Sequence, residues 1–174
     1  MIKNYLLYAI MLTGLLFATF PAKAEEPHLI STHGNWGAYT FTENGKKVCY
    51  MASQPKKMEG SSTKAKRGEV YALITNRPAE GSKNVFSYIT GYAYKPGSDV
   101  TVTIDKQHFT LFTQDDTAWA PDGTTDGKIA AAIRKGSNMV VKGTSSHGTT
   151  TTDTFVLKGS GGAYEAISKD CGKK

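Results

Sequence analysis

Hydrophobic and polar side chains alternate along most of the chain in short runs, and the runs are bounded by glycine, proline, asparagine or aspartate. Alternation with a period of two turns one set of side chains toward a core and the other toward solvent, which is typical of β-strands. The runs are also rich in the β-branched and aromatic residues that strands favour. The pattern predicts strands at residues 36–41, 47–53, 69–75, 85–94, 100–104, 109–113, 139–144 and 149–157.

The boundaries between these runs indicate how the strands are connected. Asn44-Gly45 separates the first two runs, and this pair favours the two-residue turn of a tight antiparallel hairpin. Pro55 ends the second run, because proline cannot donate a hydrogen bond to a sheet. A late hairpin is predicted around residues 145–148. Residues 25–33, which are short and polar, are predicted to be loose.

Two segments have a helical period instead. Residues 126–135 carry a narrow apolar stripe, and Thr124 or Thr125 can cap their first turn. Residues 163–170 predict a second short helix whose apolar face also includes Cys171. Together these elements predict an all-β protein: a single-domain antiparallel β-sandwich or barrel-like fold of about eight strands with two short peripheral helices.

The predicted strand at residues 85–94 is unusually aromatic. A period of two places five of its side chains on one face, namely Phe86, Tyr88, Thr90, Tyr92 and Tyr94. Such a row is more often part of a core than the lining of a ligand groove, and both interpretations stay open. Gly91 interrupts the row and indicates a bulge or a close approach of two backbones.

Residues 1–24 have the layout of a secretory signal peptide. Lys3 supplies the positive start, residues 5–20 are mostly apolar, and Ala22-Lys23-Ala24 matches an Ala-x-Ala cleavage site. The apolar run is short for a membrane span, which needs about 20 residues. We therefore expect export to the periplasm or outer membrane, and a folded domain at residues 25–174.

The charge of the exported part is mildly basic. Of the 21 Lys and Arg residues, Lys3 and Lys23 lie in the leader, so 19 remain against 15 Asp and Glu, a net charge of +4. Export and this modest charge both argue against nucleic acid as the partner.

Basic residues gather in one predicted connection: Lys56, Lys57, Lys64, Lys66 and Arg67. One interpretation is a patch for anionic partners, such as acidic glycans or a peripheral contact with an anionic membrane surface. The other is a solvated loop whose charges protect a sheet edge from aggregation.

The chain has two cysteines, Cys49 and Cys171, and both would survive removal of the leader. An oxidising compartment and an even count favour a disulfide between them, whereas two free thiols or a metal pair are the alternatives. Closing so long a loop would stabilise the fold by about 4 to 5 kcal/mol in the chain-entropy treatment, and real bridges often contribute less.

Candidate catalytic and metal-binding patterns are weak. Residues 143–147 (Gly-Thr-Ser-Ser-His) approach a serine nucleophile elbow but lack the second glycine and the strand-to-helix context. The four histidines, His28, His33, His108 and His147, have no metal-ligand spacing. The aspartates at positions 115, 116, 122 and 126 do not follow a calcium-loop pattern. We predict no catalytic residues, no cofactor and no metal.

Several longer segments carry a resemblance to a known family. They are Gly34-Asn35-Trp36, the run from Lys47 to Lys57 around Val48-Cys49-Tyr50-Met51, Arg67-Gly68-Glu69, Arg77-Pro78-Ala79-Glu80, Gly91-Tyr92-Ala93-Tyr94-Lys95, Phe109-Thr110-Leu111-Phe112, Asp116-Thr117-Ala118-Trp119-Ala120, the run Val140 to Ser146 and the ending Ala166 to Cys171. In these segments the chain resembles the invasion-associated locus B family of alphaproteobacterial exported proteins.

The resemblance implies a periplasmic or outer-membrane-associated β-sandwich-like domain without known catalytic residues. It also implies a link to host-cell entry, notably into erythrocytes, in pathogenic members. Many relatives carry another cysteine shortly after the early tryptophan, whereas this chain has Gly37-Ala38-Tyr39-Thr40 after Trp36. A second bridge is therefore not expected.

Taken together, the residues and the resemblance favour a non-enzymatic exported interaction protein. Its partner would be an envelope or host protein or glycan that the sequence does not identify, and its oligomeric state is equally open. The alternatives are an envelope hydrolase whose site is assembled only in the fold, and a structural or stress-related periplasmic protein.

Overall fold

The computed structural model describes residues 26–60 and 67–172, and most of them lie in strands. The strands are β1 (His28–His33), β2 (Trp36–Glu43), β3 (Lys46–Ser53), β4 (Lys57–Glu59), β5 (Tyr71–Arg77), β6 (Ser82–Ile89), β7 (Val100–Ile104), β8 (Gln107–Gln114), β9 (Thr117–Trp119), β10 (Asn138–Thr144) and β11 (Thr150–Val156). The helices are α1 (Gly123–Lys135) and α2 (Ser160–Cys171), with a short 3-10 turn, η1 (Pro78–Glu80). The predicted all-β class is confirmed.

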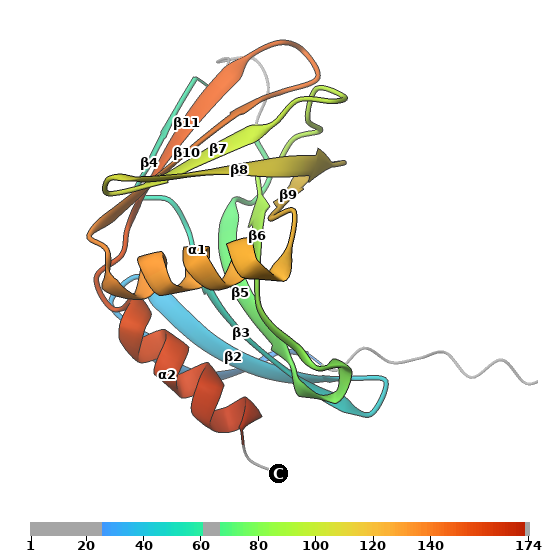
Figure 1. The fold of residues 1–174 in the computed structure, drawn as a ribbon, viewed down its shortest axis with the longest axis vertical. Helices are drawn as coiled ribbons and strands as arrows, with labels where there is room; N and C mark the ends of the chain where they lie inside the picture. Colours follow the sequence, from blue (N-terminus) through green and yellow to red (C-terminus); the bar gives the residue numbers. More distant parts are fainter. Residues whose placement is uncertain (1–25, 61–66, 173–174) are drawn as a thin grey trace, which may run out of the picture.

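All of these strands belong to one sheet, in the order β1-β2-β3-β5-β6-β9-β8-β7-β10-β11-β4, and neighbouring strands are antiparallel. The sheet folds over, so that the half containing β7, β10 and β11 faces the half containing β2, β3, β5 and β6 (Figure 1). Several contacts join the halves, among them a hydrogen bond and an aromatic contact. The Trp36 Nε1–H donates to the Val156 carbonyl at 3.2 Å, and the Tyr88 ring packs edge-on against Phe155.

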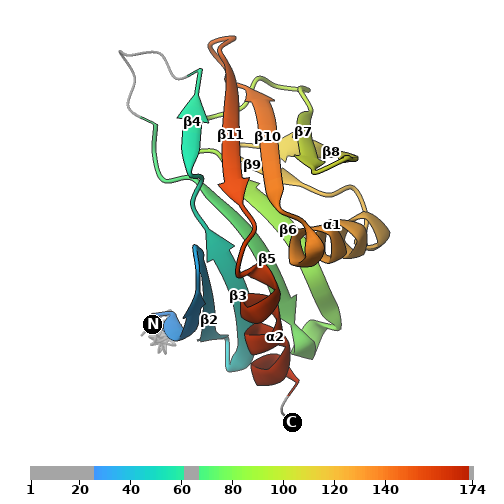
Figure 2. The same ribbon diagram turned by 90° about the vertical axis from the view of Figure 1, so that its left-hand side faces the viewer.

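The inner surface of this folded sheet holds the core. Its largest fully buried side chains include Trp36, Phe86, Tyr88 and Phe155. α2 lies across β2, β3 and β5 (Figure 2), and α1 packs against β6 and α2. The helices therefore cover the inner side of the sheet and leave the outer face of β2, β3 and β5 to other contacts.

The predicted hairpins are confirmed. Asn44 and Gly45, both at positive φ (51° and 74°), form the turn between β2 and β3, and each strand of the predicted late hairpin lies within one residue of its expected ends. Left-handed conformation at both turn residues matches the twist of the flanking strands, which is why Asn-Gly is favoured there.

The strand count was underestimated. The described residues contain eleven strands rather than about eight, because β1, β4 and β9 were not predicted. β1 forms in residues expected to be loose, and it pairs with β2 alone through its backbone. β4 and β9 are only three residues long, too short for alternation to reveal them.

The aromatic strand is shorter than predicted. β6 ends at Ile89, and Gly91 turns the chain at a φ of +73°. A Cβ on Gly91 would lie 2.5 Å from the Gly68 carbonyl oxygen, and the Gly68 N–H donates to Gly91 at 2.9 Å. The predicted close approach of two backbones is therefore confirmed.

Both helices begin earlier than predicted. Asp122, and not Thr124 or Thr125, caps α1: its side chain accepts from the Thr125 N–H at 2.8 Å. This contact is also the main reason that the pKa of Asp122 is lowered. α2 starts at Ser160, after Gly159 adopts a φ of 98°.

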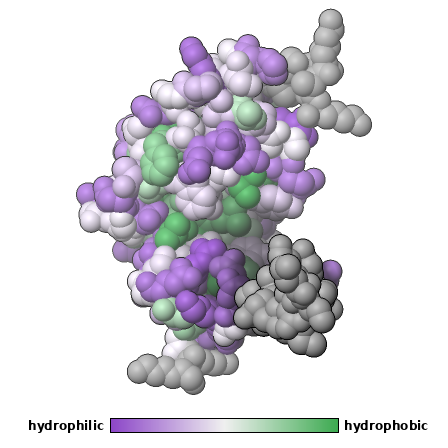
Figure 3. Space-filling model, turned by 90° about the vertical axis from the view of Figure 1, so that its right-hand side faces the viewer, coloured by the Kyte–Doolittle hydropathy of each residue, from purple (hydrophilic) through white to green (hydrophobic). Residues whose placement is uncertain are grey.

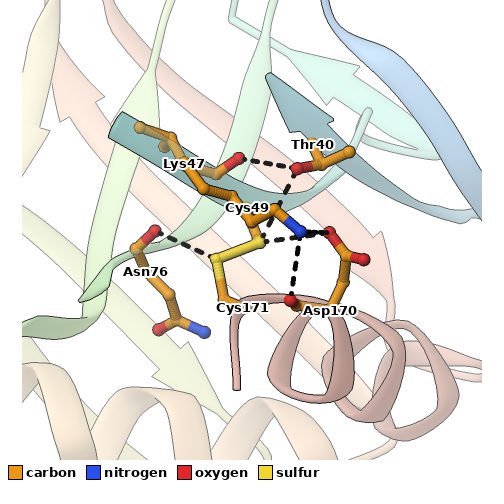
Figure 4. A network of polar contacts seen from close by, with 7 residues as sticks. Thr40, Lys47, Cys49, Asn76, Asp170 and Cys171 are labelled. Carbon is orange, nitrogen blue, oxygen red and sulfur yellow. Dashed lines mark hydrogen bonds and ion pairs between the residues drawn. A yellow bond between two sulfur atoms is a disulfide. The ribbon is translucent and has the colours of Figure 1, made fainter. Parts of the chain in front are cut away.

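Cys49 and Cys171 form a disulfide, as predicted, between β3 and the last turn of α2. Figure 4 shows its surroundings: the Lys47 ammonium pairs with the Asp170 carboxylate at 3.3 Å, and the Asn76 carbonyl lies beside the sulfur of Cys171. The bridge joins residues 122 positions apart and fastens the end of α2 onto the sheet.

Candidate ligand-binding surface

A depression opens on the outer face of the sheet where β2 begins and β3 ends. Its floor includes Gly37 and Ala52, which are directly opposite each other in the β2–β3 register. The small side chain of Ala52 leaves a hollow here, with a volume of about 390 Å³. We call this feature the outer depression. It is lined by Thr32, Gly34, Asn35, Gly37, Tyr39, Ala52, Ser53, Gln54, Pro55, Lys56 and Tyr71.

Tyrosines border the floor. The Tyr39 ring lies directly above Gly37, since a Cβ on Gly37 would come within 2.5 to 2.7 Å of the ring and hydroxyl. Tyr39 also stacks on Tyr50, with ring centroids 5.0 Å apart and planes 14° from parallel. Burial, and then the neighbouring Tyr39 and Tyr71, raise the pKa of Tyr50, so the Tyr50 phenol stays protonated at neutral pH. The rings are thus close together and fixed by packing.

Polar groups complete the rim. The Gln54 amide donates to Glu69 at 2.9 Å, and the Tyr71 hydroxyl donates to the same carboxylate oxygen at 3.2 Å. Partial burial, followed by Glu69, raises the pKa of Tyr71. Lys56 is exposed, and its ammonium has no ion pair with any described residue. The rim therefore offers an ammonium together with a side-chain amide that Glu69 holds in place.

β8 and β9 are separated from β2 and β3 in the sheet by β5 and β6, and they form another part of the surface. Figure 3 shows apolar side chains gathered across the middle of that side of the molecule, between more polar regions. Phe112 on β8 is 46% exposed and lies opposite Trp119 of β9.

A second polar cluster lies inside the molecule. The Arg67 guanidinium makes two hydrogen bonds to the Asp153 carboxylate, at 2.7 and 2.6 Å, with side-chain exposures of only 8% and 0%. The Tyr88 hydroxyl donates to the same carboxylate, and Arg67 also donates to the Thr90 carbonyl and hydroxyl, both at 2.9 Å. We call Arg67, Tyr88, Thr90 and Asp153 the internal cluster. It joins the segment before β5 to β11 across the interior.

The electrostatics of the internal cluster are those of a satisfied ion pair. Burial alone would lower the pKa of Arg67, but the hydrogen bonds and charge of Asp153 outweigh burial and raise it. Burial and the Asp153 charge raise the pKa of Tyr88. The guanidinium also lies over the Tyr92 ring, 5.0 Å from its centroid. Each charged group has its partner, so this arrangement is suited to holding the fold rather than to binding a ligand.

The predicted basic patch is only partly an exposed surface. Lys56 and Lys57 are exposed, and Lys57 pairs with Glu59 at 2.9 Å. Arg67 belongs to the internal cluster instead, so its place in an exposed patch is corrected. Lys64 and Lys66 lie outside the described residues. Binding of anionic partners by the remaining lysines stays a prediction.

The weak catalytic candidates do not converge. The Ser145 hydroxyl accepts from the Thr149 N–H within the β10–β11 turn, and His147 is exposed at the tip of that turn. Within residues 26–60 and 67–172, no three side chains of His, Cys, Asp or Glu gather as a metal site would require. In the same part of the chain, no helix is long and apolar enough to cross a membrane.

The aromatic row predicted at residues 85–94 was interpreted either as part of the core or as the lining of a ligand groove. Phe86, Tyr88 and Tyr94 are buried in the core. Tyr92 is half-buried and its hydroxyl lies 2.6 Å from that of Thr151. The tyrosines that border the outer depression come from β2 and β5 and were not singled out from the sequence. Alternation places Gly37 and Tyr39 on one face, but the meeting of Gly37 with Ala52 depends on the strand register.

The fold and the outer depression define a class of protein: a folded antiparallel sheet with a hollow on its outer face that is bordered by tyrosines and polar groups. Its family follows from comparison with known sequences. The profile of the family described as "Invasion associated locus B (IalB) protein" matches residues 36–168, and this chain belongs to that family.

A solved structure supports the fold. The crystal structure of invasion associated protein B from Bartonella henselae is similar, with a TM-score of 0.53 and 16% sequence identity, over 80% of this chain and 95% of that one. At this identity the likeness concerns the fold alone. A comparison with curated proteins gave no match.

Proposed function

We propose that this protein is an exported, non-enzymatic binding protein of the cell envelope that recognises its ligand at the outer depression. The observation that carries this proposal is the depression itself: small residues at its floor, tyrosine rings beside them, and an exposed ammonium and a fixed amide at its rim. Concave surfaces with placed polar groups are where proteins commonly bind small ligands.

Export is the second part of the proposal, and it rests on residues 1–24, which lie outside the described part of the chain. Their layout is that of a signal peptide with a cleavage site after Ala24. The disulfide is consistent with an oxidising compartment. Cell fractionation with intact-mass measurement tests this part. We expect a periplasmic or outer-membrane species that begins at Glu25, and an uncleaved cytoplasmic species would contradict it.

Binding is tested with residues 25–174 and isolated envelope fragments in a sedimentation assay. Ala52→Leu fills the floor of the outer depression from the outer side, so we expect it to abolish retention. Phe112→Ala removes an exposed ring elsewhere on the outer surface and should bind as the unmodified protein does. Equal retention of all three proteins, or none of any, would overturn the proposed site.

The name of the Bartonella protein associates it with invasion. If the same surface acts in attachment to host cells, the Ala52→Leu protein should lose binding to those cells as well as to the envelope. Erythrocytes are the first cells to examine, because the family resemblance points to them.

A further inference from the structure

We infer that the ligand of the outer depression is a saccharide, with one sugar ring seated over Ala52 and beside the Tyr39 ring, and a preference for a ring that carries a carboxylate. This inference rests on the proposed function and names the ligand class for the same site. Three features of the depression support it: its shape, its hydrogen-bonding groups and its charge.

The shape suits a flat ring. Ala52 lies at the floor, the Tyr39 ring covers Gly37 beside it, and Tyr71 lines the same hollow. Its volume of about 390 Å³ lies toward the small end of the range for ligand sites, enough for a sugar ring and part of its neighbour. One face of a sugar ring carries mainly C–H groups, which pack against the electron-rich face of an aromatic ring.

The rim suits hydroxyl groups. A sugar hydroxyl both donates and accepts hydrogen bonds, and the side-chain amides of Asn35 and Gln54 can do the same. Glu69 holds the Gln54 amide and the Tyr71 hydroxyl at 2.9 and 3.2 Å, so these groups do not have to be ordered when a ligand arrives.

The charge favours an acidic ring. Among the residues that line the outer depression, Lys56 is a cation and none is a carboxylate. Glu69 is not among the lining residues, and its carboxylate is hydrogen-bonded to Gln54 and Tyr71. Lys56 is thus in place to pair with the carboxylate of a uronic acid, whereas its neighbour Lys57 is paired with Glu59.

The surroundings argue against a peptide or a lipid chain. A peptide that is added to a sheet as a further strand binds through the unpaired backbone groups of an edge strand. The outer depression lies instead over β2 and β3, which are hydrogen-bonded to each other and to β1 and β5 on either side. A lipid chain requires a mostly apolar lining, and this lining includes Thr32, Asn35, Ser53, Gln54 and Lys56.

The experiment is a titration of isotope-labelled residues 25–174 followed by amide NMR. The probes are trisaccharides of galacturonate, glucuronate, galactose, glucose and N-acetylglucosamine. We expect at least one uronate to shift the amide signals of Gly37 and Ala52, and its neutral counterpart to bind about fivefold more weakly, the scale of one exposed ion pair. Ala52→Leu should abolish both interactions.

A matched pair of lysine variants tests the charge. Lys56→Gln should remove the preference for uronate over its neutral counterpart, whereas Lys57→Gln should leave it unchanged. A preference that survives Lys56→Gln would overturn the role of Lys56. Shifts that persist in Ala52→Leu would overturn the site.

The outcomes also separate this inference from the proposed function. If none of the five trisaccharides shifts the Gly37 and Ala52 signals while envelope retention still depends on Ala52, the saccharide is wrong and the binding function stands. If envelope retention is also independent of Ala52, both are wrong.

Discussion

The internal cluster and the outer depression are built from similar side chains, yet they lie on opposite faces of the sheet. Inside, Arg67 and Asp153 are almost fully buried and bonded to each other. Outside, Lys56 is exposed with no ion pair to the described residues, and tyrosine rings border a hollow rather than fill one.

This difference indicates which polar groups are available for binding. A buried charge must find its partner within the protein, because transfer from water without one is costly. The groups of the internal cluster are therefore committed to the fold. Polar groups around a surface hollow can exchange water for a ligand at much lower cost, which is why substitutions in the two regions should behave differently.

The largest loss of folding stability is expected from substitutions in the internal cluster. Asp153→Ala leaves the Arg67 guanidinium buried without its carboxylate and should reduce the free energy of unfolding by about 3 to 5 kcal/mol. Denaturant unfolding measures the loss. The double replacement Arg67→Met with Asp153→Leu removes both charges and should recover most of it. If Asp153→Ala lowered the free energy of unfolding by less than about 1 kcal/mol, the Arg67–Asp153 pair would not have the stabilising role assigned to it.

The disulfide is expected to make the next largest contribution to the free energy of unfolding. It joins distant segments by a covalent bond, whereas the internal cluster joins them by an ion pair. Replacing both Cys49 and Cys171 by alanine should lower the free energy of unfolding by about 2 to 5 kcal/mol, because the unfolded chain loses a long loop constraint. The unmodified protein with reductant should show a similar loss, and the double variant should not respond to reductant. A reductant-sensitive double variant would contradict this assignment.

A smaller effect on stability is expected at Asp126, a buried carboxylate that has no ion pair with any described residue. It accepts from the Phe86 N–H at 2.8 Å, but burial raises its pKa above the ordinary value. The protonated form is thus favoured by folding, and stability falls as pH rises from the unfolded pKa, about 3.9, through the folded one.

Asp126→Asn keeps the acceptor for Phe86 without the charge. We expect it to be more stable than the unmodified protein at pH 7, by about 1 kcal/mol or less. The difference should shrink as pH falls below the folded pKa. Unfolding curves of both proteins between pH 3 and 7 measure this difference in stability. A difference that grows toward acid pH would contradict the raised pKa of Asp126.

The smallest stability effect is expected in the outer depression. Ala52→Leu adds apolar atoms on the outer face, so its free energy of unfolding should stay within about 0.5 kcal/mol of the unmodified protein, as for surface substitutions in general. Its loss of ligand binding would then reflect the filled hollow and not a damaged fold. A destabilisation of about 2 kcal/mol would mean that Ala52 is packed as core.

Much of the fold could be predicted from local sequence. Alternation, the Asn44-Gly45 turn and the apolar stripe of residues 126–135 gave the hairpins and α1 to within a few residues. β4 and β9 could not be found this way, since three residues carry too little pattern. β1 was not predicted, because an edge strand can form through backbone pairing with its neighbour and does not need a row of buried side chains.

The candidate site was much less predictable. Arg67 belongs to a run of basic residues in the sequence and was therefore predicted to be exposed. Its partner Asp153 is 86 positions away, in a strand that reaches it only when the sheet folds over. In the same way, the outer depression depends on Gly37 meeting Ala52, which is a property of the β2–β3 register.

The β-rich class, the turns, the family and the two cysteines that pair can all be read from the amino-acid sequence, because they depend on local conformational preference or on residue identity. Which charges are internal and which tyrosines border a hollow could be known only from the three-dimensional fold. Those properties arise from contacts between residues far apart in the chain, and a buried ion pair and an exposed one look the same until the strands that carry them are brought together.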